Sequence, residues 1–202
     1  DLPAFGDVTL PPDFNDLDAP ALECGGAYPL PDWIESQGKQ GAPYVFGRPS
    51  GCSINWSYTD VVVSICPGSY SVNRSWSIVD ACTAQSTQSM QLIQVRDRTA
   101  PVINCPVNQT VSTDLYTCCA TVNLPDVVVA DLCSTIGNLQ AQVVVFNQYS
   151  GDTTEVTSLT GTLGNFPGND PANPDTLAVF GNTQCLPVGV HQVHYKVEDA
   201  CG

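Results

Sequence analysis

The sequence predicts an all-β protein built from tandem antiparallel β-sandwich domains. Apolar and polar residues alternate with period two in several segments, and helical periodicity is absent. Sixteen glycines and sixteen prolines separate these segments. Short strands with regular turn signals, in a chain of 202 residues, are typical of sandwiches with Greek-key connections.

The strand candidates are rich in β-branched and aromatic residues, which favour extended structure. In residues 69–80, Tyr70, Val72, Trp76 and Ile78 form an apolar face, and serines and Asn73 form the other. Arg74 lies on the apolar face, so we expect it to pair with Asp60 or Asp80. Further strands are expected in residues 53–60, 88–97, 140–148, 176–180 and 191–199.

The cysteine spacing reveals an internal repeat. Cys24 and Cys52 are 28 residues apart, as are Cys105 and Cys133; Cys66 and Cys82 are 16 apart, as are Cys185 and Cys201. The flanking residues agree, with "DLDAPALEC" matching "DRTAPVINC" and "WSIVDAC" matching "YKVEDAC". We therefore predict two homologous domains, at residues 16–97 and 98–202, the second with an insertion at about 134–184.

Residues 1–15 are predicted to belong to a neighbouring copy. After "VDAC" the first domain continues into one more strand, whereas the second stops one residue after "EDAC". If a second copy followed Gly202, its segment "DVTLPPDF" would occupy the place of that strand. We expect residues 1–15 to complete the preceding repeat, either within one long tandem polypeptide or by strand donation between separate subunits.

Charge and cysteine content limit the function classes. The net charge is −14 with six Lys and Arg residues, which excludes a basic nucleic-acid-binding surface. No apolar run is long enough for membrane insertion. Ten dispersed cysteines, with no C-x-x-C pair, predict a disulfide framework and an extracellular or cell-surface location.

The second domain resembles the hyalin-repeat (HYR) family. The residues that carry this resemblance are "DRTAPVINCPVNQTV", "VADLC" and "LPVGVHQVHYKVEDACG". The first domain is similar to HYR-related modules of giant surface adhesins of Bacteroidota, but it lacks the Cys-Pro and Pro-Val-Gly signatures. The resemblance implies immunoglobulin-like sandwiches with an extracellular adhesive or spacer role and no catalysis.

Strand length limits the disulfide pairing. Cys66 and Cys82 flank one extended strand, so they lie too far apart to bond. This leaves Cys24–Cys82 with Cys52–Cys66, favoured because a turn is expected at residues 59–60, or Cys24–Cys66 with Cys52–Cys82. The equivalents of the favoured set are Cys105–Cys201 and Cys133–Cys185. Cys118 and Cys119 would then form a vicinal pair or bond to another chain.

Aspartates recur near the predicted domain junctions. Carboxylates at such junctions can hold Ca²⁺, the one cofactor that we consider. The alternative is that each aspartate caps a turn through its own backbone. The candidate residues are Asp16, Asp18, Asp80, Asp97, Asp131 and Asp199.

Other motifs carry weaker functional signals. His191 and His194 are three apart on an expected strand, so they face opposite sides and cannot share one ion. Thr153 and Thr176 follow aspartates in short motifs that resemble O-glycosylation sites, and Asn55, Asn73 and Asn108 lie in N-x-S/T sequons. The polar loop at residues 164–175 is a candidate for surface recognition.

The sequence therefore predicts a non-enzymatic structural repeat unit of an extracellular filament or giant cell-surface adhesin. Its expected partners are identical copies joined head to tail, together with surface glycans or other cells. No catalytic triad, nucleophile elbow or phosphate loop is present. The alternative function is a carbohydrate-binding module of a secreted enzyme, for which Trp33 is the candidate contact residue.

Overall fold

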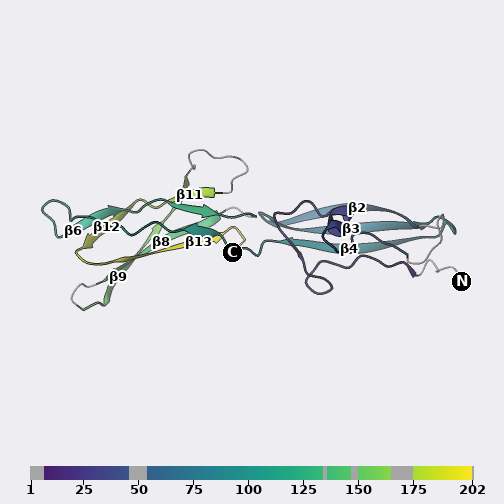
Figure 1. The fold of residues 1–202 in the computed structure, drawn as a ribbon, viewed down its shortest axis with the longest axis horizontal. Helices are drawn as coiled ribbons and strands as arrows, with labels where there is room; N and C mark the ends of the chain where they lie inside the picture. Colours follow the sequence, from purple (N-terminus) through teal and green to yellow (C-terminus); the bar gives the residue numbers. More distant parts are fainter. Residues whose placement is uncertain (1–6, 46–53, 134–135, 147–149, 165–174, 202) are drawn as a thin grey trace. The chain divides into compact units, whose positions relative to one another are not determined.

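The computed structural model describes residues 7–45, 54–133, 136–146, 150–164 and 175–201. These residues form an all-β protein that divides into two compact units, Asp1–Arg98 and Thr99–Gly202 (Figure 1). Each unit is described by itself. No helix in the described ranges is long and apolar enough to cross a bilayer.

Unit 1 is organised around one four-stranded sheet. Its strands are β1 (Leu22–Glu23), β2 (Ile54–Cys66), β3 (Ser69–Asp80) and β4 (Ser86–Arg96), in the order β1-β4-β3-β2. The hairpins β2–β3 and β3–β4 are antiparallel, and β1 pairs parallel with β4. The expected turn at residues 59–60 is wrong, because β2 stays paired with β3 through this stretch.

Strand β3 confirms the alternation expected from the sequence. Val72, Trp76 and Ile78 are almost fully buried, and Ser75 on the opposite face is exposed. Arg74 shares the buried face and is completely inaccessible to solvent. The apolar face of β3 therefore lies against the core of unit 1.

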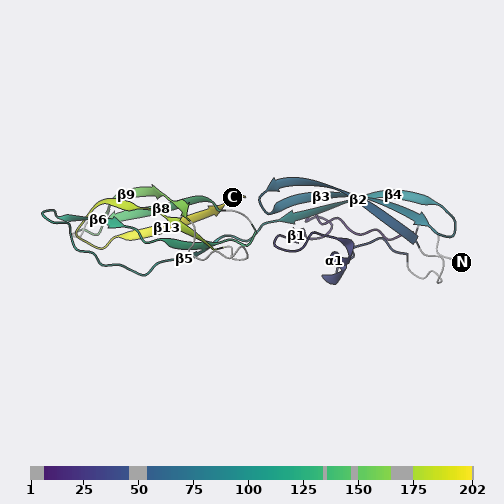
Figure 2. The ribbon, with the colours of Figure 1, turned by 90° about the horizontal axis from the view of Figure 1, so that it is seen from above.

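The buried face of this sheet is covered by residues 8–44 (Figure 2). These residues include the short helix α1 (Pro31–Ser36), which starts with a proline and is followed by Gly38 at φ 72°. The described part of unit 1 contains no second sheet in this layer, although a sandwich was expected. Prolines recur through these residues, and a proline cannot donate a ladder hydrogen bond.

The N-terminal segment also packs on unit 1 of its own chain. Thr9 and Tyr44 exchange backbone hydrogen bonds, and the Phe14 N–H donates to the Leu92 carbonyl at 2.8 Å. The Phe14 side chain is 1% exposed. This corrects the expectation for residues 9–14, which bond to their own unit; residues 1–6 lie outside the described part of the chain. Burial of a large aromatic side chain accounts for this placement.

The described residues of unit 2 form three sheets, with strand orders β10-β11-β7-β5, β12-β6 and β13-β8-β9. The strands are β5 (Val102–Asn104), β6 (Cys119–Asn123), β7 (Val127–Ala130), β8 (Ile136–Phe146), β9 (Thr153–Thr160), β10 (Thr162–Gly164), β11 (Asp175–Val179), β12 (Asn182–Pro187) and β13 (Gln192–Asp199).

The core of unit 2 lies between two of these sheets. Val127 and Val129 of β7 and Ala178 of β11 pack with Val143 and Val145 of β8 in one buried cluster. This face-to-face packing of sheets is the sandwich arrangement expected from the sequence.

One strand pair is common to both units. In unit 1, β2 and β3 pair antiparallel with Ile54 opposite Asp80. In unit 2, β8 and β13 pair antiparallel with Ile136 opposite Asp199. Each aspartate precedes a cysteine by two residues. The chain in excess over unit 1 therefore begins after Phe146 rather than near residue 134, because β8 takes the place of β2.

Candidate functional site

Three strand-end aspartates form the same local turn. The Oδ1 atom of Asp80 accepts a hydrogen bond from the Cys82 N–H at 2.8 Å. Asp131 accepts one from Cys133 at 2.8 Å, and Asp199 accepts one from Cys201 at 2.7 Å. An aspartate that bonds to the backbone two residues ahead makes an Asx-turn. The alternative considered for these three aspartates, turn capping, is therefore present in the structure.

Asp131 and Asp199 are the two candidates within unit 2 that the fold brings together. Their carboxylate oxygens lie within 4.8 Å of each other. A pair of carboxylates at this spacing could supply oxygen ligands to a cation such as Ca²⁺. One oxygen of each already accepts its turn hydrogen bond. The Ca²⁺ hypothesis stays a prediction.

Asp16 and Asp18 are occupied by side chains of unit 1. A hydrogen bond from Arg98, followed by one from the Ala21 N–H, holds the pKa of Asp16 below its ordinary value. The Arg96 guanidinium lies 3.2 Å from the same carboxylate. Asp18 accepts a hydrogen bond from the Asn15 amide at 3.1 Å. These contacts assign both aspartates a role in fixing the loop before β1.

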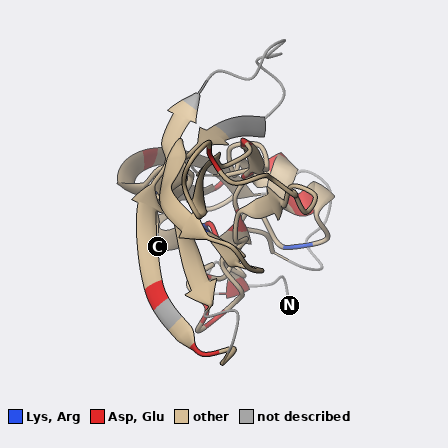
Figure 3. Ribbon diagram, turned by 90° about the vertical axis from the view of Figure 1, so that its left-hand side faces the viewer, with Lys and Arg blue, Asp and Glu red and all other residues tan. Residues whose placement is uncertain are grey.

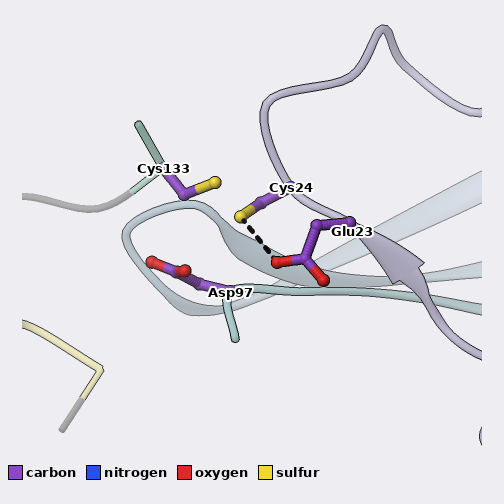
Figure 4. Close-up of side chains that lie close together, drawn as sticks. All are labelled: Glu23, Cys24, Asp97 and Cys133. Atoms are coloured by element: carbon purple, nitrogen blue, oxygen red, sulfur yellow. Dashed lines mark hydrogen bonds between the residues drawn. The ribbon is translucent and has the colours of Figure 1, made fainter. Parts of the chain in front are cut away.

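Asp97 lies beside Glu23 and Cys24 at one end of the sheet of unit 1 (Figure 4). The Cys24 sulfur is 3.6 Å from a Glu23 carboxylate oxygen. The Asp97 N–H donates to the Ser69 hydroxyl at 2.8 Å, which places Asp97 at the start of β3. Asp80 is the last residue of β3, so the fold separates Asp80 from Asp97 by the length of that strand.

One disulfide of unit 2 differs from the expected pairs. Cys119 bonds to Cys185, which joins β6 to β12. Cys105 and Cys118 are exposed free thiols. The predicted Cys133–Cys185 and Cys105–Cys201 bridges, and the vicinal Cys118–Cys119 pair, are therefore wrong. Because β12 pairs with β6 across 66 residues of sequence, spacing between repeats could not reveal this contact.

The sheet register also overturns the bridge favoured for unit 1. Leu22 pairs with Val95, and Val95 pairs with Tyr70, so Cys24 lies near the start of β3. Cys82 follows the other end of β3, roughly 40 Å away at about 3.3 Å per residue. A Cys24–Cys82 bond is therefore excluded, although both residues form disulfides. Cys66, Cys133 and Cys201 are also bonded, and Cys52 lies outside the described residues.

Arg74 forms the predicted ion pair with Asp60. Its Nε and Nη2 atoms each donate to Asp60 at 2.8 Å, and Nη2 also donates to the Pro29 carbonyl. Tyr28 donates its hydroxyl proton to Asp60 at 2.7 Å. The guanidinium lies 4.4 Å from the Tyr58 ring centre, so the ring face also stabilises the buried charge.

The hydrogen bonds of this network, together with burial, shift the pKa values of Asp60 and Tyr28. Burial alone would raise the pKa of Asp60, but hydrogen bonds from Arg74 and Tyr28 outweigh it and hold the pKa below its ordinary value. Burial and the hydrogen bond to Asp60 together raise the pKa of Tyr28 to about 12. Asp60 is therefore a carboxylate, and Tyr28 a neutral phenol, near neutral pH.

The Trp56 and Trp76 rings of unit 1 do not form a flat platform. Trp33 is half-buried, and one edge of its ring packs over Gly26. Trp56 is 38% exposed, and it meets Trp76 edge-on, with 83° between the ring planes. A sugar-binding platform needs exposed coplanar rings, so this arrangement gives the carbohydrate-binding alternative no support.

The remaining candidates lie apart from these groups. The Phe146 N–H donates to Nδ1 of His191, whose Nε2 contacts the Pro187 carbonyl at 2.7 Å, which indicates a structural role for this histidine. Thr153 is exposed at the start of β9, and Thr176 lies on β11, with its side chain outside the described set. The candidate recognition loop falls almost entirely on residues 165–174, which are also outside it.

The sheet edges are a feature that sequence reasoning treated only in part. Among the described strands, none pairs with the outer edge of β13 in unit 2 or with the outer edge of β2 in unit 1. An open edge presents backbone donors and acceptors to a further strand.

Comparisons of the chain with protein-family models, with curated proteins and with solved structures find no match.

Proposed function

We propose that the chain is a structural repeat unit of an extracellular filament or giant cell-surface adhesin, joined head to tail with identical copies. The observation that carries this proposal is the open edge of β13. In unit 1 the equivalent strand β3 pairs with β4 along ten residues, whereas in unit 2 no described strand occupies that place. A strand from the next copy would complete the sheet.

In this proposal the donor is the beginning of residues 1–15 of the next copy. Thr9 and Phe14 bond to their own unit, and residues 1–6 lie outside the described part of the chain. The donor lies in the next repeat of a tandem polypeptide or in a separate subunit. The resemblance to HYR repeats supports an extracellular adhesive or spacer role, as does the disulfide between β6 and β12.

The remaining features favour a structural role over an enzymatic one. In the buried ion pair of unit 1, Asp60 accepts hydrogen bonds from Arg74 and Tyr28, and the Arg74 side chain is inaccessible to solvent. Acidic residues are spread over the described chain and basic ones are few (Figure 3). We propose that surface glycans or other cells are bound elsewhere on the assembled fibre.

The strand-completion proposal is tested by extending the chain. Residues 1–15 are appended after Gly202, and hydrogen exchange of β13 amides is compared with that of the unextended protein. We expect slower exchange from Gln192 to Glu198 and a higher thermal midpoint for unit 2. The control extension has the same composition in scrambled order. If both extensions leave β13 exchange unchanged, the proposal is wrong.

A separate measurement distinguishes the two assemblies. The native protein is run on a reducing, denaturing gel. A band at many multiples of 21.4 kDa indicates a covalent tandem array, and a band near 21.4 kDa indicates subunits joined by strand donation.

A further inference from the structure

The second open edge, on β2 of unit 1, carries exposed apolar side chains. Val61 is 62% exposed, Val62 52%, Val63 50% and Ile65 61%. These residues project to both faces of the strand, so neither face of this half of β2 is covered. In the described chain no strand pairs with this edge. A long, apolar, uncovered edge is a site at which another strand can add.

In unit 2 the equivalent sheet edge is paired with another strand. Strands β2 and β8 can be aligned through the residues with which they pair on β3 and β13. In this alignment Val61 and Val62 are equivalent to Val144 and Val145 of β8. In unit 2 these two valines pair with Val156 and Glu155 of the antiparallel strand β9. Unit 1 has the equivalent strand, with valines at the same two positions, and among its described residues it lacks the covering strand.

We infer that the outer edge of β2 pairs antiparallel with β2 of a second copy of this chain, around a two-fold axis at Val62. In this register Val62 faces its own counterpart, and Val61 faces Val63 of the other copy. Thr59 then faces Ile65, and Asp60 faces Ser64. The triple valine makes the segment self-complementary, as a two-fold interface requires.

Charge favours a second copy as the occupant. The chain carries a net charge of −14, so most surfaces of two copies repel each other. Strand β2 contains one acidic residue, Asp60, and no basic residue, and Asp60 is paired with Arg74. The outward face of β2 and β3, beside the edge, is also uncharged. Its residues are Asn55, Ser57, Thr59, Val61, Val63, Ser71, Asn73, Ser75, Ser77 and Val79.

The size of the contact sets the strength that we expect. A 13-residue strand is roughly 43 Å long at about 3.3 Å per residue. Pairing along one edge buries less than the roughly 1,200 Å² of a standard interface, which places the contact in the weak class. We expect a dimer that forms at roughly micromolar to millimolar chain concentrations. Joined sheets of this kind would bundle filaments side by side, independently of the head-to-tail contact at β13.

The test is sedimentation of the full chain over a range of concentrations. We expect reversible dimerisation, and Val62→Lys should weaken it at least tenfold because two lysines then face each other across the axis. Val63→Lys, on the opposite face of the strand, should weaken it similarly and serves as the second variant if Val62→Lys does not fold. Val156→Lys, at an equally exposed valine of β9, is the matched control and should leave the dimer intact.

Other outcomes overturn the inference. A chain that stays monomeric up to roughly millimolar concentration excludes the interface. So does a dimer that survives both β2 substitutions, or one that Val156→Lys disrupts equally. A dimer disrupted by Met90→Lys, on the outward face of β4, and not by Val62→Lys would indicate contact between sheet faces instead of edges. None of these results bears on strand addition at β13, which the extended chain tests separately.

Discussion

The central strand pairs of the two units carry different side chains at equivalent paired positions. In unit 1 Arg74 lies opposite Asp60, and in unit 2 the equivalent residues are Val193 and Val143. Both rungs face a core. One is a buried ion pair tied to Tyr28, and the other is a pair of apolar side chains. The backbone pairing common to both units therefore does not depend on the buried charge.

The two sheets also differ in which edge is covered. In unit 1 the third strand, β4, pairs with β3; in unit 2 the third strand, β9, pairs with β8. Among the described strands, each unit therefore leaves open the edge that the other one covers. Because the strands at the open edges are equivalent in position to strands that are paired in the other unit, both edges have the geometry to accept a partner.

The largest effect is expected in the smallest sheet. The β6–β12 pair has two strands and is held by the Cys119–Cys185 bond, whereas β3–β4 is a long pairing within a larger sheet. Replacing both cysteines by alanine releases a loop of 66 residues and should cost about 4 kcal/mol of unfolding free energy. Urea denaturation measures the loss. Cys118→Ala is the control and should change little; equal losses would refute a special role for the bridge.

Removing one partner of the ion pair of unit 1 is expected to destabilise the protein more than replacing both partners by apolar residues. Arg74→Met leaves Asp60 without its cation in a mostly buried site and should cost about 3 kcal/mol. The double variant Arg74→Val/Asp60→Val copies the rung of unit 2 and should recover most of that loss. Urea midpoints of the three proteins test this. An unchanged midpoint for Arg74→Met would show that the pair contributes nothing.

Trp76 of β3 and Tyr195 of β13 occupy equivalent positions, which permits a second exchange between units. The indole N–H of Trp76 donates to the buried Gln91 side chain at 3.2 Å. Trp76→Tyr removes this donor and leaves a cavity, so it should cost about 2 kcal/mol. Trp56→Tyr, at a partly exposed ring, should cost less than half as much. Thermal melts followed by circular dichroism compare the two, and equal costs would contradict this account of the core.

The smallest effect concerns pH. Because the folded protein lowers the pKa of Asp60, this group contributes stability above its ordinary pKa of 3.8 and loses that contribution as pH falls further. The Arg74→Val/Asp60→Val variant should therefore lose stability less steeply than the wild type below about pH 4. Thermal midpoints between neutral pH and about pH 2 give the two slopes. Parallel slopes would mean that Asp60 is not the group responsible.

Local patterns in the sequence predicted the strands that carry the core. The bounds of β3 and its buried face follow directly from the alternation in residues 69–80. The Asp60 partner of Arg74 was one of two candidates, because a cation on an apolar face requires a nearby carboxylate. Helix α1 was missed because six residues are too few to display a helical period.

The all-β class, the repeated Asp-x-Cys strand end and the buried face of β3 could all be predicted from the sequence, because side-chain alternation is a local property of an extended backbone. The structure was needed to show that Cys119 bonds to Cys185, that Phe14 packs against β4 and that no described strand covers the outer edges of β2 and β13. These features depend on which distant segments pair, and the free energy of such pairing is set by the packing of the whole unit and not by any one strand.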